Sequence, residues 1–150
     1  MSASAPDDEA AARVRASFAR QTIMTTIGAE ILAVRRGEVE IVLPYSDRIL
    51  QQHGFIHAGA IATIADSACG YAGLSVMPRD SAVLTTEFKI NLLSPAKGER
   101  LRAVGRVVRR GKTLVVTLGE VFAESAGASK QVALMTGTMM VVAIDTGLRD

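Results

Sequence analysis

Six segments of the chain show the alternation of apolar and polar residues, or the short apolar runs, that predict β-strands. The clearest lies at 82–93, where Leu84 and Phe88 alternate with Thr85 and Glu87. The six segments are residues 28–34, 38–43, 82–93, 100–110, 113–123 and 131–143. The last two are apolar on both faces, so we expect both faces of these strands to be covered.

Two further segments have the pattern of helices. Residues 7–19 are amphipathic and begin with acidic residues, which stabilise the positive end of a helix dipole. Residues 57–76 are long enough for a helix and end before Pro78, which disfavours its continuation. The order of elements predicts an α+β fold, an antiparallel meander wrapped on one long helix. We expect one domain over residues 1–150, with 1–20 as an N-terminal helical extension.

The composition is that of a single globular domain. Of the 150 residues, 49% are hydrophobic and 21% are charged. The single cysteine, Cys69, cannot form an internal disulfide, and the N-terminal residues lack the basic and apolar regions of a secretory signal. We therefore expect a cytoplasmic protein.

The charge is small but unevenly distributed. The net charge is only +2, which does not by itself indicate a nucleic-acid partner. Basic residues nonetheless crowd the stretch from Lys97 to Lys112, where Glu99 is the one acid. Such a patch can hold phosphate groups, or it can be a solvated strand face. No basic helix is evident and aromatic residues are only 4%, so we expect no nucleic-acid binding.

The predicted long helix is rich in alanine and glycine and has no hydrophilic face. Glycine inside a helix costs about 1 kcal/mol relative to alanine, and close approach to another backbone is the usual reason for it. We expect this helix to be buried by the sheet or by a second subunit. A membrane span is not expected, because Asp66 lies in its middle and large aliphatic residues are few.

Asp66 is therefore a carboxylate on a buried helix. Such a group must find hydrogen bonds, ionise against a partner or take a raised pKa. It is either a structural acid, satisfied by Ser67 or a nearby backbone amide, or a catalytic group. The residues alone leave both interpretations open.

The stretch from His57 to Asp66, HAGAIATIAD, resembles the hot-dog-fold acyl-CoA thioesterases, in particular the branch related to the phenylacetic acid degradation thioesterase. In that family a His-Gly-Gly opens the central helix, and an Asp follows nine residues after the His. The strands and turns of TTEFKINLLSPAKGERLRAVGRVVRRGKTLVVTLGEVF also match, and the resemblance covers about residues 27–143. It implies a five- to six-stranded antiparallel sheet around a long helix, and a homodimer or homotetramer with shared active sites.

The resemblance also implies roles in hydrolysing a small or aryl acyl-CoA. Asp66 would act as a general base that activates water, or as the nucleophile. The backbone amides of Ala58 and Gly59 would bind the thioester carbonyl and stabilise its oxyanion. Gln51 would orient the water or the carbonyl, and His57 would shape the start of the helix.

Four more residues gain roles from the resemblance. Thr85 would help to position the water of the partner's site. Arg109, Arg110 and Lys112 would meet the phosphates of coenzyme A, which enters as part of the substrate. No other cofactor and no metal is expected.

Two positions depart from the family pattern. Ala58 replaces the first glycine of the His-Gly-Gly, which keeps the amide but adds a methyl group beside the thioester. Gly70 stands where some members carry a polar side chain one turn after the acid. Both changes bear on the substrate rather than on the reaction class.

Other functions were compared with the same residues. A non-catalytic acyl-CoA-binding protein would keep the pocket and the basic patch, with Asp66 as a structural acid. A hydratase of the same fold needs a histidine shortly after the Asp, and none follows Asp66. Zinc binding by His53 and His57 is not expected, because Gly54 and the predicted loop prevent a shared helical face. Cys69 is expected to be an inert core thiol.

Overall fold

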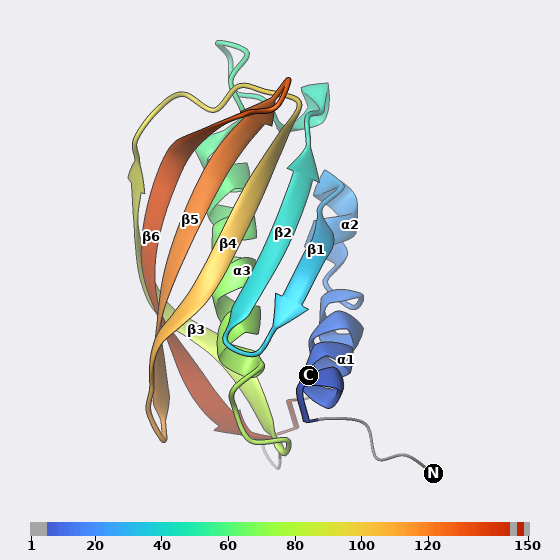
Figure 1. The fold of residues 1–150 in the computed structure, drawn as a ribbon, viewed down its shortest axis with the longest axis vertical. Helices are drawn as coiled ribbons and strands as arrows, with labels where there is room; N and C mark the ends of the chain where they lie inside the picture. Colours follow the sequence, from blue (N-terminus) through green and yellow to red (C-terminus); the bar gives the residue numbers. More distant parts are fainter. Residues whose placement is uncertain (1–5, 145–146, 149–150) are drawn as a thin grey trace.

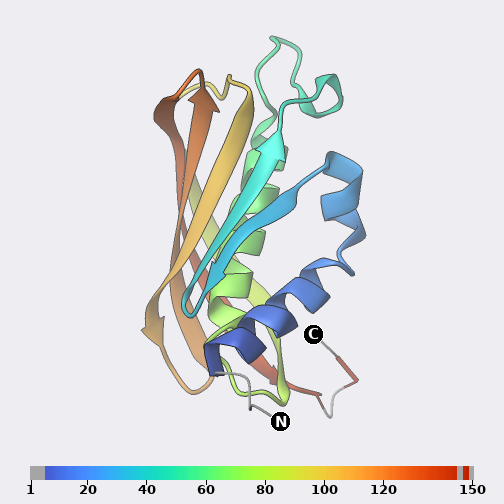
Figure 2. The same ribbon diagram turned by 45° about the vertical axis from the view of Figure 1, so that its right-hand side comes forward.

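A six-stranded antiparallel sheet curves around one long helix, α3 (Ala58–Leu74), in this computed structural model, which describes residues 6–144 and 147–148 (Figure 1). Two short helices, α1 (Pro6–Phe18) and α2 (Thr22–Ile27), lie beside the edge strand β1 (Glu30–Arg35) (Figure 2). The other strands are β2 (Glu38–Pro44), β3 (Ser81–Leu92), β4 (Arg100–Arg110), β5 (Leu114–Ser125) and β6 (Ala128–Ala143).

The α+β prediction is confirmed, and each predicted helix and strand is present with its ends shifted by a few residues. Helix α2 was not predicted, because its six residues, TIMTTI, are rich in β-branched side chains and too few to show a helical period. It ends at Gly28, whose positive φ of 80° caps the helix. Among the described helices, none is long and apolar enough to cross a membrane. The cytoplasmic location stays a prediction.

The strands do not form a simple meander. Their order in the sheet is β1-β2-β4-β5-β6-β3. Helix α3 carries the chain from β2 across the concave face to the far edge, where β3 pairs with β6 and Phe88 lies opposite Gly137. The predicted meander is therefore wrong for β3, because the long helical crossover returns the chain to the edge of the sheet that is remote from β2.

Close contact between α3 and the sheet depends on glycines in the strands. A Cβ atom at Gly105 of β4 would lie 2.2 Å from the carbonyl carbon of Ala68. One at Gly119 of β5 would lie 2.8 Å from Sγ of Cys69. By contrast, a Cβ at Gly70 in the helix would meet no atom within 4 Å. Close approach therefore explains the two strand glycines, and within one chain it does not explain Gly70.

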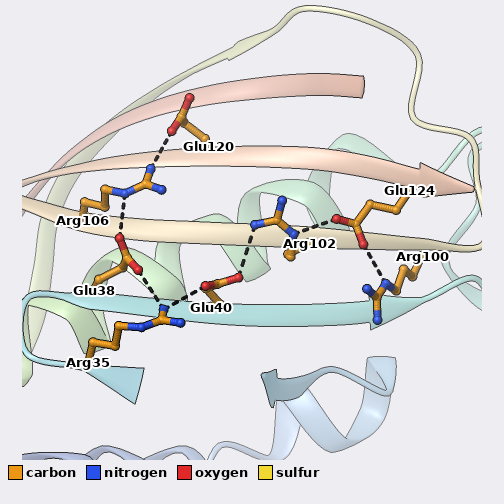
Figure 3. Close-up of polar contacts among 8 residues, drawn as sticks. All are labelled: Arg35, Glu38, Glu40, Arg100, Arg102, Arg106, Glu120 and Glu124. Atoms are coloured by element: carbon orange, nitrogen blue, oxygen red, sulfur yellow. Dashed lines mark hydrogen bonds and ion pairs between the residues drawn. The ribbon is translucent and has the colours of Figure 1, made fainter. Parts of the chain in front are cut away.

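The outer face of the sheet is divided into a charged half and an apolar half. On the charged half, Arg102 donates to Glu124 at 2.7 Å and to Glu40 at 3.2 Å, and Arg106 donates to Glu38 at 2.8 Å. Figure 3 shows these contacts, which link β2, β4 and β5, and those of Arg35, which add β1. The network comprises Arg35, Glu38, Glu40, Arg100, Arg102, Arg106, Glu120 and Glu124. Three cations of the basic stretch are thus paired with glutamates on a solvated strand face.

The apolar half lies over β3, β6 and β5. Leu84, Met140 and Leu114 form a cross-strand row, since Met140 pairs with both of the others. All three are exposed, as is Val116. The predicted covering of both faces of β5 and β6 is therefore incomplete in one chain.

Exchanging glycine for alanine should distinguish the two kinds of glycine. Gly105→Ala places a methyl group inside the backbone of α3, and we expect it to lower the free energy of unfolding by about 3 kcal/mol or more, at or above the upper end of ordinary overpacking. Gly70→Ala is the matched control and should raise it by up to about 1 kcal/mol, because alanine is the better helix former. Urea denaturation of both variants measures the difference. Equal effects would contradict this account of the packing.

Candidate functional site

Asp66 lies halfway along α3, half-buried at a pocket of about 240 Å³. The hydroxyl of Thr85 donates to Oδ1 of Asp66 at 2.8 Å. Strand β3 has an irregularity between Thr85 and Glu87 in its pairing with β6, next to this contact. The structure thus joins two of the predicted site residues within one chain, whereas the resemblance placed Thr85 at the partner's site.

The environment of Asp66 changes its acidity. Burial raises the pKa of the Asp66 carboxyl above its ordinary value, and the hydrogen bond from Thr85 opposes part of that rise. A carboxylate with a raised pKa accepts a proton more readily than an exposed aspartate. It is therefore better suited to act as a general base near neutral pH.

His57 caps the start of α3. Its Nδ1 accepts the N–H of Gly59 at 2.8 Å, and its carbonyl oxygen accepts the N–H groups of Ala60 and Ile61 at 3.0 and 3.2 Å. The ring proton of a neutral His57 is therefore on Nε2. The amide of Gly59 is occupied by this cap, whereas the exposed Ala58 N–H meets no hydrogen-bond partner in the described part of the chain.

Gln51 lies in the turn before the helix. Its side-chain oxygen accepts the N–H of His53, and its carbonyl oxygen accepts the N–H of Gly54 at 3.0 Å. Gln51 and Ala58 line one side of a second pocket, of about 430 Å³. The rest of this lining is largely apolar and includes Phe55, Ile56, Ile61, Leu92 and Leu93. The structure brings Gln51 and Ala58 together, as the resemblance implies.

The two groups of predicted residues do not meet within one chain. Ala58 and Asp66 are eight residues apart in one helix, which separates them by about 12 Å along its axis at 1.5 Å per residue. The Asp66 carboxylate and the Ala58 amide therefore line separate pockets of one chain.

The basic residues lie elsewhere. Arg109 and Arg110 end β4, and Lys112 follows in the turn to β5. Arg110 and Lys112 line a third pocket, of about 310 Å³, together with Met77 and Pro78 beyond the C-terminal end of α3. All three cations are exposed, and none forms an ion pair within the described ranges. They lie near the end of α3 that is opposite to Ala58.

The N-terminal part of the Asp66 pocket was not predicted from the sequence. Ser17 lines this pocket from α1, Gln21 from the connection between α1 and α2, and Tyr71 from α3. Gln21 accepts a hydrogen bond from Ser67 at 3.2 Å, beside Asp66. The sequence carries one signal for this part of the pocket, because Ser17 lies between Val14 and Phe18 on the buried face of an amphipathic helix.

Two alternative chemistries gain no support. Burial raises the pKa of the Cys69 thiol to about 12, so this cysteine is not a thiolate nucleophile at neutral pH. Within residues 6–144 and 147–148, no three His, Cys, Asp or Glu side chains gather as a metal site.

Comparisons with known proteins agree with this fold. The family model of the thioesterase superfamily matches residues 53–130, just over half of the chain. A thioesterase family protein from Silicibacter pomeroyi is 47% identical, with a TM-score of 0.88 over 89% of this chain and 98% of that one. The E. coli PaaI protein, from the phenylacetic acid degradation operon, shares the fold at 22% identity, with a TM-score of 0.83 over 93% and 97% of the two chains.

A relative named as an enzyme has a related sequence. The 1,4-dihydroxy-2-naphthoyl-CoA hydrolase of Listeria monocytogenes is 24% identical over 94 residues, which are 63% of this chain and 76% of that one. Together with the long helix inside its antiparallel sheet, these matches establish the family. The chain has the hot-dog fold and belongs to the thioesterase superfamily, as a thioester hydrolase.

Proposed function

We propose that this protein hydrolyses a small or aryl acyl-CoA, with Asp66 activating the attacking water. The observation that carries the proposal is the contact of Asp66 with Thr85 beside a pocket. Water attacks the thioester carbonyl and loses a proton to Asp66, and the C–S bond then breaks to give a carboxylic acid and coenzyme A. An aryl acyl group is supported by the naphthoyl-CoA substrate in the name of the Listeria relative. Direct attack by Asp66, through an anhydride, is the variant mechanism.

Groups at the start of α3 supply the proposed contact with the oxyanion. The open N–H of Ala58 lies at the positive end of the helix dipole, where negative charge on the thioester oxygen is stabilised. Gln51 lines the same pocket and supplies a second polar group. Gly59 would join them only when His57 releases its amide, because the cap uses that N–H.

We further propose that two chains complete each site. Asp66 and Ala58 line different pockets of one chain, about 12 Å apart along α3 at 1.5 Å per residue, so these pockets would act as half-sites in which Asp66 of one chain works with Ala58 of another. The exposed row of Leu84, Met140 and Leu114 on the outer face is an apolar surface that association would cover. A homodimer is the smallest assembly that completes the sites and covers this surface, and a homotetramer would contain two such dimers.

Replacing Asp66 should separate a catalytic acid from a structural one. Asp66→Asn keeps the hydrogen bond with Thr85 but cannot take a proton, so we expect kcat to fall by about 10² or more. Because the folded state raises the pKa of Asp66, its charge costs stability above that pKa. The variant should therefore unfold at a higher temperature than wild type at pH 7. This gain should fade as the pH falls through the raised pKa toward the ordinary value.

The pH dependence gives an independent check. General-base activity is lost as the pH falls through the pKa of Asp66, so the acid limb of kcat/KM should lie above the ordinary aspartate value of 3.8. Thiol release from phenylacetyl-, benzoyl-, acetoacetyl- and palmitoyl-CoA measures turnover. Retained turnover with lower stability in Asp66→Asn would make Asp66 a structural acid. If coenzyme A esters raise the melting temperature of the protein but are not hydrolysed, the protein binds acyl-CoA without catalysing its hydrolysis.

A mixed-chain experiment tests the shared site. Ala58→Pro removes the proposed oxyanion donor, and proline is well tolerated at the first helical position. His57 already has φ −61° and ψ 139°, the conformation that a residue before proline prefers. We expect kcat to fall by about 10²–10³ in this variant.

Equimolar Ala58→Pro and Asp66→Asn chains, unfolded and refolded together, should recover about a quarter of wild-type activity. Half of the random dimers are then mixed, and each mixed dimer has one intact site if the two halves come from different chains. Separately refolded variants, mixed afterwards without exchange, are the control. No recovery in verified mixed dimers would place both halves in one chain.

The role of Arg110 and Lys112 can be tested with a substrate that lacks the phosphates of coenzyme A. If Arg110 and Lys112 meet the phosphates of coenzyme A, the double variant Arg110→Gln/Lys112→Gln should raise KM for an acyl-CoA by roughly tenfold. It should leave hydrolysis of the same acyl group on pantetheine, which lacks those phosphates, unchanged. Lys130→Gln, an exposed lysine in β6, is the control. Equal losses on both substrates would contradict the assignment.

A further inference from the structure

Another pocket lies at the end of the molecule where α3 ends. Three segments meet there: the first turns of α1, the turn between β1 and β2, and the loop from α3 to β3 (Figure 2). Among the described residues, it shares no lining residue with the pockets of Asp66 and Ala58. Its volume of about 190 Å³ is smaller than the roughly 300–1,000 Å³ of typical small-molecule sites, so it suits a small ion.

Three arginines converge on this pocket, one from each segment. Arg13 extends from α1, Arg36 from the turn after β1, and Arg79 from the loop after α3. Glu9, one turn before Arg13 in α1, is the one acid among the described residues of the lining. With three positive charges and one negative charge, the lining carries an excess of two positive charges.

The side chains of this cluster differ in how they are held. Arg13 donates to the carbonyl oxygen of Pro78 at 2.8 Å and to that of Ser81, which fastens α1 to the loop that carries Arg79. Arg79 forms an ion pair with Glu9. Arg36 is exposed, and within residues 6–144 and 147–148 its side chain forms no hydrogen bond or ion pair.

The turn that carries Arg36 is anchored to the end of α3. The N–H of Gly37 donates to Oγ of Ser75 at 2.7 Å, and the carbonyl oxygen of Gly37 accepts the N–H of Val107 at 2.9 Å. Gly37 has a positive φ of 80°, which is why a glycine follows Arg36. The arginines therefore extend from backbone positions that are fixed relative to one another.

Arginine is suited to bind phosphate, because its planar fork donates two parallel hydrogen bonds to oxygen atoms. Three neighbouring cations repel one another, and Glu9 offsets this repulsion only in part. A phosphate group carries a charge of about −1.5 to −2 at pH 7, which matches the excess of two positive charges. A single carboxylate would leave one positive charge uncompensated.

We propose that this pocket binds a phosphate dianion, either free or as the end group of a small organic molecule. Arg36 and Arg79 supply the donors, Arg13 adds its charge, and the anion displaces Glu9 from Arg79. The bound anion ties α1 to the β1–β2 turn and to the loop after α3. The site does not depend on the proposed hydrolysis.

Calorimetric titration with inorganic phosphate, at an ionic strength held constant with chloride, tests the site. The double variant Arg36→Gln/Arg79→Gln should weaken binding at least tenfold, because it removes two charge-assisted contacts. Glu9→Gln should tighten binding by roughly three- to tenfold, because the competing carboxylate is gone. Arg15→Gln is the matched control, since Arg15 is an exposed arginine of α1 outside the pocket, and it should change nothing.

The opposite signs separate anion binding from damage to the fold. Glu9→Gln and Arg79→Gln break the same ion pair from its two sides, so a purely structural role predicts the same effect for both. At ten times the dissociation constant, phosphate should raise the melting temperature of wild type by about 3–6 °C. The rise should persist in Arg110→Gln/Lys112→Gln, which alters the other cationic pocket, and disappear in Arg36→Gln/Arg79→Gln.

Two further probes identify the form of the ligand. Equal affinities for inorganic phosphate and phenyl phosphate would identify the free dianion as the ligand, and tighter binding of phenyl phosphate would identify an organic phosphate. Acetate should bind at least tenfold more weakly than either. The proposal is overturned by the absence of saturable binding of both phosphates. It is equally overturned if binding survives Arg36→Gln/Arg79→Gln, or if Glu9→Gln weakens it.

Discussion

The structure depends on how closely α3 approaches the sheet. Ala68 and Cys69 lie where strand side chains would normally be, because Gly105 and Gly119 have none. The concave face can then enclose a helix whose own residues are small, with Ile64, Ala65 and Ala68 excluded from solvent. Packing at this density leaves little freedom for the helix to slide. The positions of its capped start and of its mid-helix carboxylate are therefore fixed relative to the strands.

This fixed helix accounts for the division of the proposed chemistry between two places. A helix offers its amide donors only at its first turn, whereas Asp66 needs partial burial to have a raised pKa. Both requirements are met in α3, but at places separated along its axis. The charge of Asp66 costs stability in the folded chain, which is typical of a group retained for reactivity. A raised pKa is what the proposed catalytic role of Asp66 requires.

Local patterns in the sequence were enough to predict most elements, while long-range pairing was not predictable. The alternation at 82–93 correctly indicated a strand, yet nothing local shows that β3 pairs with β6 at the far edge. The resemblance brought Asp66 and Thr85 together as site residues, and the structure adds that they touch in the same chain. Ser17 was not found, because its partner Tyr71 is 54 residues away and only the folded chain brings the two hydroxyls together.

The ion-pair network on the outer face has a consequence for how an anionic molecule first meets this protein. Arg100, Arg102 and Arg106 are matched by glutamates at contact distance, so their fields cancel close to the surface. Beyond one Debye length, about 8 Å at physiological ionic strength, little of their attraction remains. The positive potential of this stretch is concentrated at the β4–β5 turn, around Arg110 and Lys112. Diffusing polyanions are therefore drawn toward one tip of the molecule, and salt slows that encounter.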